Sequence, residues 1–570
     1  MRYFVLATDY DGTLATDGRV SDETIAALKR LRLSGRKLIL VTGRELEDLQ
    51  RAFPELDLFD WVVVENGALL YSPASRQEKP LGSKPPEEFI KALRDRKVDP
   101  LSVGRVIVAT WHPNETTVLQ TIRELGLELQ VIFNKGAVMI LPSGINKAVG
   151  LTAALDEMKL SPHNVVAVGD AENDHAFLEL CQCSVAVANA LPVVKERVDF
   201  VTENSRGAGV VELIDRLLAS DLTEINIQRE QHNILLGTRE DDSLVNIQAY
   251  GSNLLLTGTS GGGKSTLATA VLERIAEQNY QFCIIDPEGD YENFEDAVIL
   301  GDTNRAPRIQ EILDLLEQPH QNVIVNLLGV ALADRPAFFA EFLPQLQELR
   351  ARTGRPHWIV VDEAHHLMPA SWNPASLTLP QKLDCMMFIT VHPDQVAPAA
   401  LSLVDAIITV GLSPEKNIEQ FCSVVGHCPP QLAPQKLEPG EAMVWFRESE
   451  TEPFRFRITP GNTERRRHVR KYAQGQLGED KSFYFVGPLG KLNLRAQNLI
   501  LFTQIAEGVD DETWLYHLKQ GDYSRWFQEA IKDDSLAEEA EKIEKTANGS
   551  ARESRAAIKA AIEQRYTLPA

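Results

Sequence analysis

The chain opens with Phe4-Val5-Leu6-Ala7-Thr8-Asp9-Tyr10-Asp11-Gly12-Thr13-Leu14, and this stretch decides the fold of the N-terminal part. A short hydrophobic run that stops at two carboxylates is typical of a strand in a parallel α/β sheet followed by a loop. Ligands of such sheets bind beyond the carboxyl ends of the strands, so we expect Asp9 and Asp11 to face a ligand. One carboxylate can attack a bound group while the other transfers a proton.

The alternation of strands and helices continues to about residue 215. Short β-branched runs alternate with amphipathic stretches such as residues 22–33, which predicts a Rossmann-like parallel α/β sheet. A second α/β unit interrupts the pattern between about residues 67 and 140, and we interpret it as an inserted cap. The runs that predict strands of the main sheet lie at residues 4–8, 37–41, 61–64, 164–168 and 184–188.

Polar and charged residues also follow the later strands of this predicted sheet. Thr42 offers a hydroxyl after the second strand, and Lys147 offers a cation. Asp170 and Asp174 follow a further strand, and carboxylates are preferred ligands of Mg²⁺. A carboxylate can attack an anionic phosphoryl group only if a metal ion and a cation reduce the repulsion. The set therefore predicts Mg²⁺-dependent phosphoryl transfer.

This set resembles the haloacid-dehalogenase-like phosphatases, specifically the Cof-type and sucrose-phosphatase-like branch, over about residues 1–215. The resemblance implies that Asp9 is the nucleophile and Asp11 the general acid/base. It also implies that Thr42 and Lys147 contact the phosphate.

The same resemblance implies a magnesium site and a cap that closes over the substrate. Asp9 and Asp170 would contribute carboxylates, Asp174 would support the site, and Asp11 would add its backbone carbonyl oxygen. The cap would select the leaving group, although a Trp-His-Pro turn is also a common packing corner. The candidate cap contacts are Trp111, His112 and Asn114.

A second phosphate-handling motif lies in the middle of the chain, between a hydrophobic run at residues 253–257 and a helical stretch at 267–276. Its glycines let successive backbone amides converge on nucleotide phosphates, Lys264 adds positive charge, and the Ser265 hydroxyl can reach Mg²⁺. The motif predicts an ATP site formed by Gly258, Gly261, Gly262, Gly263, Lys264, Ser265 and Thr266.

A pair of acids completes this second site further along the chain. Asp362 and Glu363 end the hydrophobic run His357-Trp358-Ile359-Val360-Val361. Asp362 suits a water-mediated contact with Mg²⁺, and Glu363 can polarise the attacking water. Together with the phosphate loop, the pair predicts ATP hydrolysis. Further runs that predict a second parallel α/β domain, of the RecA-like P-loop type, lie at residues 282–286, 323–326 and 386–390.

This region resembles the HerA/FtsK superfamily of ring-forming motor ATPases, and HerA-like proteins most closely. The resemblance rests on residues 232–237, the phosphate loop, residues 284–291 and residues 362–365. Such relatives typically form hexamers and pull nucleic acid through a pore. The chain departs from them where a glutamine is expected after residues 386–390, because His392 stands there. It also has no clear β-barrel before the core, so ATP hydrolysis has more support than translocation.

Basic residues give two weaker indications. Arg352 and Arg355 are candidates for an arginine that acts on the nucleotide of a neighbouring subunit, with solvated helix-end arginines as the alternative interpretation. Residues 465–471 are a basic run that could contact phosphates near a pore, or could be a plain linker.

The last part of the chain predicts a small helical module. Its helical stretches carry Trp514 and Trp526 at spacings that suit an aromatic core, and His517 has no metal-binding pattern around it. We therefore expect three domains, which are a phosphatase at residues 1–220, an ATPase at 225–460 and a helical accessory region at 461–570.

Composition restricts the cellular setting. The net charge of −23 argues against a nucleic-acid coat or a binder of anionic membranes, although it leaves DNA open as a ligand. The chain has six cysteines without a Cys-x-x-Cys pair and lacks a long apolar stretch, so we expect a cytoplasmic protein that does not enter a membrane.

The leading hypothesis is a bifunctional enzyme, a Mg²⁺-dependent phosphomonoester phosphatase fused to an ATP-hydrolysing, HerA-like ring ATPase that is expected to be a hexamer. The phosphatase substrate would be a sugar phosphate, a nucleotide or a nucleic-acid end. One alternative is a nucleic-acid end-processing enzyme with 3′-phosphatase and 5′-kinase activities. Another is a nucleotide-sensing scaffold that regulates the phosphatase.

Overall fold

The computed structural model divides the chain into two compact units, Met1–Ile458 and Thr459–Ala570. Each unit has its own hydrophobic core. The structure describes residues 1–134, 136–225, 233–259, 262–292, 294–371, 385–432, 436–447, 451–461, 482–488, 490, 492–531, 533–546 and 550–566.

An eight-stranded sheet forms the N-terminal part of the first unit, in the order β12-β11-β10-β1-β2-β3-β4-β5. Neighbouring strands from β12 to β3 are parallel, whereas β4 and β5 continue the sheet as an antiparallel pair. This confirms the predicted Rossmann-like core. The strands are β1 (Val5–Asp9), β2 (Lys37–Val41), β3 (Trp61–Val64), β4 (Leu69–Ser72), β5 (Gln77–Pro80), β10 (Val165–Gly169), β11 (Cys183–Ala186) and β12 (Phe200–Val201).

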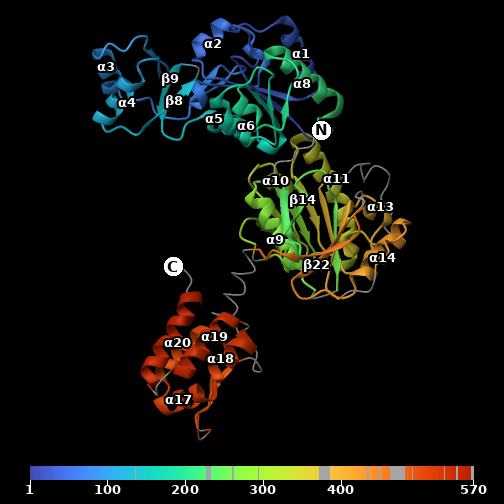
Figure 1. Ribbon diagram of the computed structural model, residues 1–570. Helices are drawn as coiled ribbons and strands as arrows, with labels where there is room; N and C mark the ends of the chain where they lie inside the picture. Colours follow the sequence, from blue (N-terminus) through green and yellow to red (C-terminus); the bar gives the residue numbers. More distant parts are fainter. Residues whose placement is uncertain are drawn as a thin grey trace. The chain divides into compact units, whose positions relative to one another are not determined.

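Helices cover both faces of this sheet (Figure 1). The central parallel strands β1, β2 and β10 are buried along nearly their whole length, as expected for a parallel sheet between helical layers. The helices are α1 (Asp22–Leu33), α2 (Leu46–Ala52), α5 (Lys147–Glu157), α6 (His175–Leu180), α7 (Pro192–Lys195) and α8 (Arg206–Ser220), with short 3₁₀ turns at Leu56–Leu58, Glu65–Gly67, Pro162–Asn164 and Glu172–Asp174.

The inserted cap is a separate antiparallel sheet of order β6-β7-β9-β8. It packs against α3 and α4, and the cap elements lie together at one end of the domain in Figure 1. The insertion was expected to begin at about residue 67, but β4 and β5 still belong to the main sheet, so the cap sheet begins only at β6. The cap elements are α3 (Glu87–Asp95), β6 (Ser102–Val103), β7 (Val108–Trp111), α4 (Glu115–Glu124), β8 (Leu129–Asn134) and β9 (Ala137–Pro142).

An eleven-stranded sheet forms the rest of the first unit, in the order β14-β13-β23-β22-β21-β15-β20-β19-β16-β18-β17. Strands β21 to β17 are parallel, and the four at the other edge are antiparallel. The strands are β13 (Asn233–Thr238), β14 (Leu244–Gln248), β15 (Leu254–Gly258), β16 (Phe282–Asp286), β17 (Val298–Leu300), β18 (Val323–Asn326), β19 (Trp358–Val361), β20 (Met386–Thr390), β21 (Ala406–Val410), β22 (Glu441–Phe446) and β23 (Phe454–Ile458).

Helices lie on both faces of this second sheet as well (Figure 1). Two buried clusters, one on each face, include residues of the same strands, because alternate side chains of a strand point to opposite faces. The predicted second parallel α/β domain is thereby confirmed. Its helices are α9 (Lys264–Glu277), α10 (Ile309–Leu316), α11 (Arg335–Thr353), α12 (Ala364–Leu367), α13 (Pro398–Leu401) and α14 (Pro414–Val425), with 3₁₀ turns at Leu332–Asp334 and Pro393–Gln395.

The second unit is mostly helical, as predicted, and packs its helices around an aromatic core. Trp514 is fully buried and stacks on Tyr523, with ring centroids 4.4 Å apart. His517 is part of this core, because its Nε2 accepts a hydrogen bond from the backbone of Val486 at 3.1 Å. The elements are β24 (Phe483–Phe485), β25 (Leu494–Ala496), α16 (Leu499–Gly508), α17 (Asp511–Gln520), α18 (Asp522–Trp526), a π-helical turn (Phe527–Ile531), α19 (Asp534–Thr546) and α20 (Ala551–Tyr566).

Within the described ranges, every helix is too short or too polar to cross a membrane.

Candidate active sites

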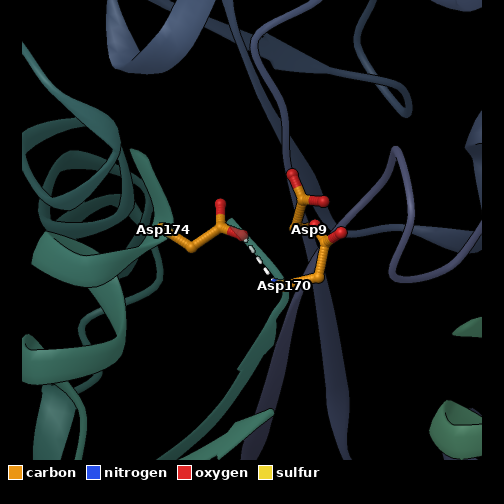
Figure 2. A group of neighbouring side chains, drawn as sticks. All are labelled: Asp9, Asp170 and Asp174. Atoms are coloured by element: carbon orange, nitrogen blue, oxygen red, sulfur yellow. Dashed lines mark hydrogen bonds between the residues drawn. The ribbon is translucent and has the colours of Figure 1, made fainter. Parts of the chain in front are cut away.

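Three buried carboxylates meet at the carboxyl edge of the N-terminal sheet. Asp9 ends β1, Asp170 follows β10, and Asp174 ends the 3₁₀ turn just before α6; each offers an oxygen within 4.8 Å of the others. Figure 2 shows these side chains around one point. The Asp174 carboxylate also accepts the backbone N–H groups of Asp170, at 2.8 Å, and Ala171, at 2.9 Å. Asp174 is therefore held in place by the loop that carries Asp170.

Lys147 supplies the counter-charge for this group. Its Nζ lies 2.6 Å from Oδ1 of Asp9 and 2.5 Å from Oδ1 of Asp174, and its side chain is 1% exposed. Asn146 caps α5 by accepting the Val149 N–H, which fixes Lys147 at the first turn of the helix. When ionised, three carboxylates and one ammonium leave a formal charge of −2, which suits a divalent cation with oxygen ligands.

Burial and charge change the proton affinity of Asp9. Burial, and after it the charge of the Asp174 carboxylate, raise the pKa of Asp9 to about 7, although Lys147 opposes both effects. The pKa of Lys147 lies above its usual value, because attraction to Asp174 and Asp9 outweighs its own burial. The Lys147 ammonium therefore stays charged, while the Asp9 carboxylate competes with a proton near neutral pH.

Thr42 and Asp11 lie at the same edge of the sheet. Thr42 follows β2, is buried, and accepts the Arg44 N–H on its hydroxyl oxygen at 3.2 Å. The Asp11 carboxylate is not part of the three-carboxylate group, because Arg44 binds it through two hydrogen bonds of 2.7 and 2.8 Å. Arg44 also contacts Asp48 at 2.8 Å. Arg44 therefore fixes the Asp11 carboxylate outside the three-carboxylate group.

Glu65 joins the core to the cap. Its buried carboxylate accepts the backbone N–H groups of three consecutive cap residues, Arg105, Val106 and Ile107, each at 2.8 Å. Glu65 itself has a left-handed backbone with φ of 52°. The loop before β7 is thus anchored close to the sheet edge that carries Thr42.

The candidate cap contacts differ in their surroundings. Trp111 is exposed, whereas the Asn114 amide donates to the carbonyls of Asp99 and Trp111 and to the hydroxyl of Thr110. His112 pairs with Glu115 at 2.9 Å. The Asn114 amide is therefore used within the turn, whereas the side chains of Trp111 and His112 are both exposed.

The phosphate loop follows β15 in the second sheet. Gly258 has φ of +147°, and a Cβ there would lie 2.1 Å from the Val410 carbonyl oxygen, so only glycine fits between β15 and β21. Gly263 has φ of +98° and caps α9, and the amino end of a helix is a common binding site for phosphate. Gly262 lies between them, and Gly261 is outside the described residues.

In this structure the Lys264 ammonium forms its hydrogen bonds within the phosphate loop itself. Nζ of Lys264 donates to the carbonyl oxygens of Gly258, at 3.1 Å, and Thr259, at 3.2 Å. Burial lowers the pKa of Lys264, and nearby Glu363 and Asp362 oppose this shift. Thr266 follows in the first turn of α9 and is half-buried.

A second acidic turn approaches the phosphate loop. The hydroxyl of Ser265 donates to Asp290 at 3.1 Å. Asp286 at the end of β16 accepts the N–H groups of Gly289, at 2.8 Å, and Tyr291, at 3.2 Å, and so shapes the turn that carries Asp290. The Mg²⁺-binding hydroxyl expected of Ser265 thus faces a carboxylate.

The two predicted catalytic acids follow β19. Burial raises the pKa of Asp362 well above its usual value and raises that of Glu363. Glu363 has a left-handed backbone with φ of 41°, and its carboxylate contacts Nδ1 of His365 at 3.3 Å. His365 also lies 3.1 Å from the Thr390 hydroxyl and edge-on to His392, with ring centroids 5.6 Å apart. The histidine in the expected glutamine position therefore belongs to the surroundings of Glu363.

The two candidate arginines lie in different environments. Arg355 is completely buried, so in this conformation it cannot reach a neighbouring subunit. Arg352 is 64% exposed and pairs with Glu317 at 2.6 Å. The basic run at residues 465–471 lies outside the described residues.

Sequence patterns missed the roles of Arg44 and Glu65. Arg44 stands three residues beyond a strand, which marks it as an edge residue, but nothing local shows that it binds Asp11. Glu65 precedes Asn66-Gly67, a turn signal, and its contact with residues 105–107 depends on the docking of the cap.

Two family models match the chain. A model described as haloacid dehalogenase-like hydrolase matches residues 6–120 and 109–214. A model described as AAA domain matches residues 247–390, which include the phosphate loop and both acids. The expected fusion of a haloacid-dehalogenase-like hydrolase with a P-loop ATPase domain is thereby confirmed.

Relatives of known name match the N-terminal part. Phosphoglycolate phosphatase 2 of Saccharolobus solfataricus is 33% identical over 224 residues, 38% of this chain and 93% of the relative. Phosphoglycolate phosphatase of Methanothermobacter thermautotrophicus is 30% identical over 222 residues, 37% of this chain and 98% of the relative. A crystal structure of a haloacid dehalogenase-like hydrolase from Bacteroides thetaiotaomicron has a TM-score of 0.34 and 20% identity, covering 38% of this chain and 99% of that one.

Proposed function

Because the chain belongs to the haloacid dehalogenase-like hydrolases through its N-terminal domain, and carries an AAA-type domain after it, we propose that it is a Mg²⁺-dependent phosphomonoester phosphatase fused to an ATP-hydrolysing motor domain. The observation that carries the phosphatase proposal is the pair of short contacts from Lys147 to Asp9 and Asp174. This pair holds an attacking carboxylate and a metal-binding carboxylate at one cation. The proposed domains are residues 1–220, 225–460 and 461–570.

In the proposed reaction, Asp9 attacks the phosphorus atom and the alcohol oxygen of the substrate leaves, which forms an aspartyl phosphate. Lys147 orients Asp9 and reduces the repulsion between its carboxylate and the phosphate. Thr42 offers its hydroxyl to a phosphate oxygen. Water then attacks the phosphorus of the aspartyl phosphate, and inorganic phosphate leaves Asp9.

Asp11 serves as the general acid and then as the general base. It gives a proton to the leaving oxygen in the first step and takes one from water in the second. Arg44, which binds both oxygens of Asp11, positions this carboxyl group between the two steps. Asp9, Asp170, Asp174 and the Asp11 carbonyl would hold Mg²⁺, and the ion when bound would neutralise charge on the phosphoryl group.

The first substrate to test is 2-phosphoglycolate, a small phosphorylated carboxylic acid. The two relatives named above are phosphoglycolate phosphatases, and this chain covers nearly their whole length. The guanidinium of Arg44, which already binds a carboxylate, is the group at this edge suited to a substrate carboxylate. Sugar phosphates, nucleotides and phosphorylated DNA ends are the comparison substrates.

The second site is proposed to hydrolyse ATP. Lys264, Thr266 and the amides of the phosphate loop would hold the phosphates, and Ser265 and Asp362 would hold Mg²⁺. Glu363 would polarise the attacking water, since burial has already raised its pKa towards that of a base able to accept a proton. We further propose that the ATPase domains form a HerA-like hexameric ring that acts on DNA in the cytoplasm. The sequence motifs support this proposal.

The deciding experiment measures phosphate release from the substrate panel by the full chain and by two variants. Asp9→Asn should lose phosphatase turnover and keep ATP hydrolysis, whereas Lys264→Ala should do the reverse. Phosphatase activity that survives Asp9→Asn would contradict the assignment of the first site. Transfer of label from ATP to 5′-hydroxyl DNA, without release of free phosphate, would favour a kinase instead.

A further inference from the structure

The phosphatase domain and the P-loop domain contact each other through buried polar side chains inside the unit Met1–Ile458. His163 of the phosphatase stacks on Tyr280 of the P-loop domain, with ring centroids 3.7 Å apart and 16° between the ring planes. His357 packs edge-on against both rings, at 5.5 and 5.3 Å. The Tyr280 hydroxyl donates to Oε1 of Gln182 at 2.6 Å.

His163 also binds the end of the helix that follows the phosphate loop. Its Nε2 lies 2.8 Å from the Gln278 carbonyl oxygen, and because a carbonyl only accepts, Nε2 donates the hydrogen bond. Its other ring nitrogen, Nδ1, lies 2.9 Å from Oε1 of Gln182, and burial lowers the pKa of the ring. Gln278 is the C-cap of α9, and Lys264 is the first residue of the same helix.

Arg355 is a buried cation at the same contact surface, and it forms hydrogen bonds to both domains. Its guanidinium donates to the Lys159 carbonyl oxygen of the phosphatase at 2.6 Å, and to the Gln281 amide oxygen and the Leu316 carbonyl oxygen, each at 3.1 Å. A buried charge is tolerated only with such partners, and removing them would leave it unsatisfied. The phosphatase domain therefore supplies one of the hydrogen bonds that stabilise the buried charge of Arg355.

The shapes of the two domains also fit closely at this surface. A Cβ at Gly354, whose φ is +72°, would lie 2.4 Å from the side-chain nitrogen of Asn164, so glycine is required at the end of α11. Exposed pairs surround the buried residues: Asp156 contacts His320 at 3.3 Å, and Lys159 contacts Glu317 at 3.7 Å. Specific interfaces commonly have a closely packed, buried centre that is surrounded by a polar rim.

The contact residues lie at the opposite ends of the strands from the two sites. Asn164 precedes β10, which leads to Asp170, and His357 precedes β19, which leads to Asp362. Helix α5 begins at Lys147 and ends shortly before Lys159. Both sites therefore face away from the interface, which excludes direct transfer of a product from one site to the other across it.

The contacts of Lys264 in the phosphate loop have to change when a nucleotide binds. In this structure Lys264 binds carbonyl oxygens of its own loop, and these bonds must open when the ammonium turns to a nucleotide phosphate. The change occurs at the first turn of α9, and His163 holds the other end of that helix. Packed helices respond to such changes by small rigid shifts.

We propose that this interface couples the two catalytic centres, so that nucleotide bound at the phosphate loop changes turnover by the phosphatase. The change would be transmitted by α9, β16 and β19 in the P-loop domain. In the phosphatase domain it would be transmitted by α5 and β10. The proposal deepens the proposed function, because it assigns the phosphatase a regulator, the nucleotide state of the neighbouring domain. Linkage makes the coupling of binding reciprocal. If nucleotide changes the affinity for a phosphatase ligand by some factor, that ligand must change the affinity for nucleotide by the same factor.

The test measures kcat/KM of the full-length phosphatase without nucleotide, with ADP and with a non-hydrolysable ATP analogue. Nucleotide should change kcat/KM by about fivefold or more, the lower range of measured couplings. His163→Ala and Tyr280→Phe should reduce this change to less than about twofold while keeping both basal activities. His320→Ala, which removes an exposed rim pair, is the matched control and should keep the full effect.

Amide hydrogen exchange of residues 159–164 is measured in parallel, and exchange there should slow when the analogue binds. If no phosphomonoester is hydrolysed, the proposed function fails, and hydrogen exchange alone decides the coupling. Nucleotide that binds without changing either turnover or exchange would overturn the proposal. Two further results would overturn it as well. One is a nucleotide-induced change in kcat/KM that stays the same in both interface variants. The other is the same change when nucleotide is added to Lys264→Ala chains that do not bind it. Tyr280→Phe removes a single hydroxyl, so it decides the outcome if His163→Ala does not fold.

Discussion

The ammonium of Lys147 lies 2.6 Å from the carboxylate of Asp9, although 138 positions of sequence separate the two residues. Lys147 stands at the first turn of α5, after the cap, and Asp9 at the end of β1, before it. The cap is therefore inserted in the chain between Asp9, the proposed nucleophile, and its counter-charge. Both residues of this pair belong to elements of the core domain, β1 and α5.

Replacing Lys147 with Met should destabilise the phosphatase domain and abolish its turnover. The substitution leaves Asp9 and Asp174 as buried carboxylates without their cation, which costs about 3–5 kcal/mol in comparable pairs. Loss of charge stabilisation should lower kcat by at least about 10²-fold. Urea unfolding and phosphate release measure the two effects. Lys79→Met, which breaks an exposed pair with Glu157, is the control and should change neither by much.

Magnesium should bind more tightly as the pH rises. The pKa of Asp9 is raised to about 7 in the metal-free protein, so below pH 7 a proton must leave before the carboxylate can bind the ion. The apparent Kd for Mg²⁺ should fall by up to about tenfold per pH unit on going towards pH 7, and level off above it. Calorimetry in buffers of different ionisation enthalpy reports the released proton. The same slope in Asp9→Asn would show that another group binds it.

Much of the phosphatase site follows from local sequence. Asp9, Thr42 and Asp170 each follow a hydrophobic strand, and a parallel sheet brings the ends of its strands to one edge. Lys147 was identified by its motif alone. The sequence therefore predicts which residues share this edge, but the hydrogen bonds from Lys147 to two aspartates depend on the packing of α5.

Contacts between elements distant in the chain could not be predicted. Its place at a helix end makes Arg355 a candidate to act on a neighbouring subunit, yet tertiary packing buries it and bonds it to the Lys159 carbonyl oxygen of the phosphatase domain. Nothing near Arg44 indicates its two bonds to Asp11. For a similar reason the sequence pattern does not show that β4 pairs with β3 and β5 with β4, which prolongs the main sheet before the cap sheet begins.

Replacing Glu363 with Gln should slow ATP hydrolysis by about 10²- to 10⁴-fold while nucleotide binding is kept, because an amide cannot accept a proton from water. Lys264→Ala should weaken binding itself. Nucleotide affinity and phosphate release under single-turnover conditions separate the two effects. Asp314→Asn on the exposed side of α10 is the control. Hydrolysis at the normal rate by Glu363→Gln would require another base.

Subunit mixing should reveal a ring. If an arginine such as Arg352 completes the site of a neighbouring subunit, then adding Lys264→Ala chains to the unmodified protein should depress ATP hydrolysis more than dilution does. Light scattering with ATP and Mg²⁺ gives the assembly size. A monomer that hydrolyses ATP at a specific rate independent of protein concentration would contradict the ring.

The most direct test of the account is to trap the phosphoryl group on Asp9. During turnover of 2-phosphoglycolate with Mg²⁺, borohydride should reduce the aspartyl phosphate to homoserine, and peptide mass spectrometry should find homoserine at position 9 and not at position 11. The modification should be absent without substrate and in Asp9→Asn. Rapid release of phosphate under conditions that trap acyl phosphates, with an unmodified Asp9, would contradict the covalent mechanism and the role given to Lys147.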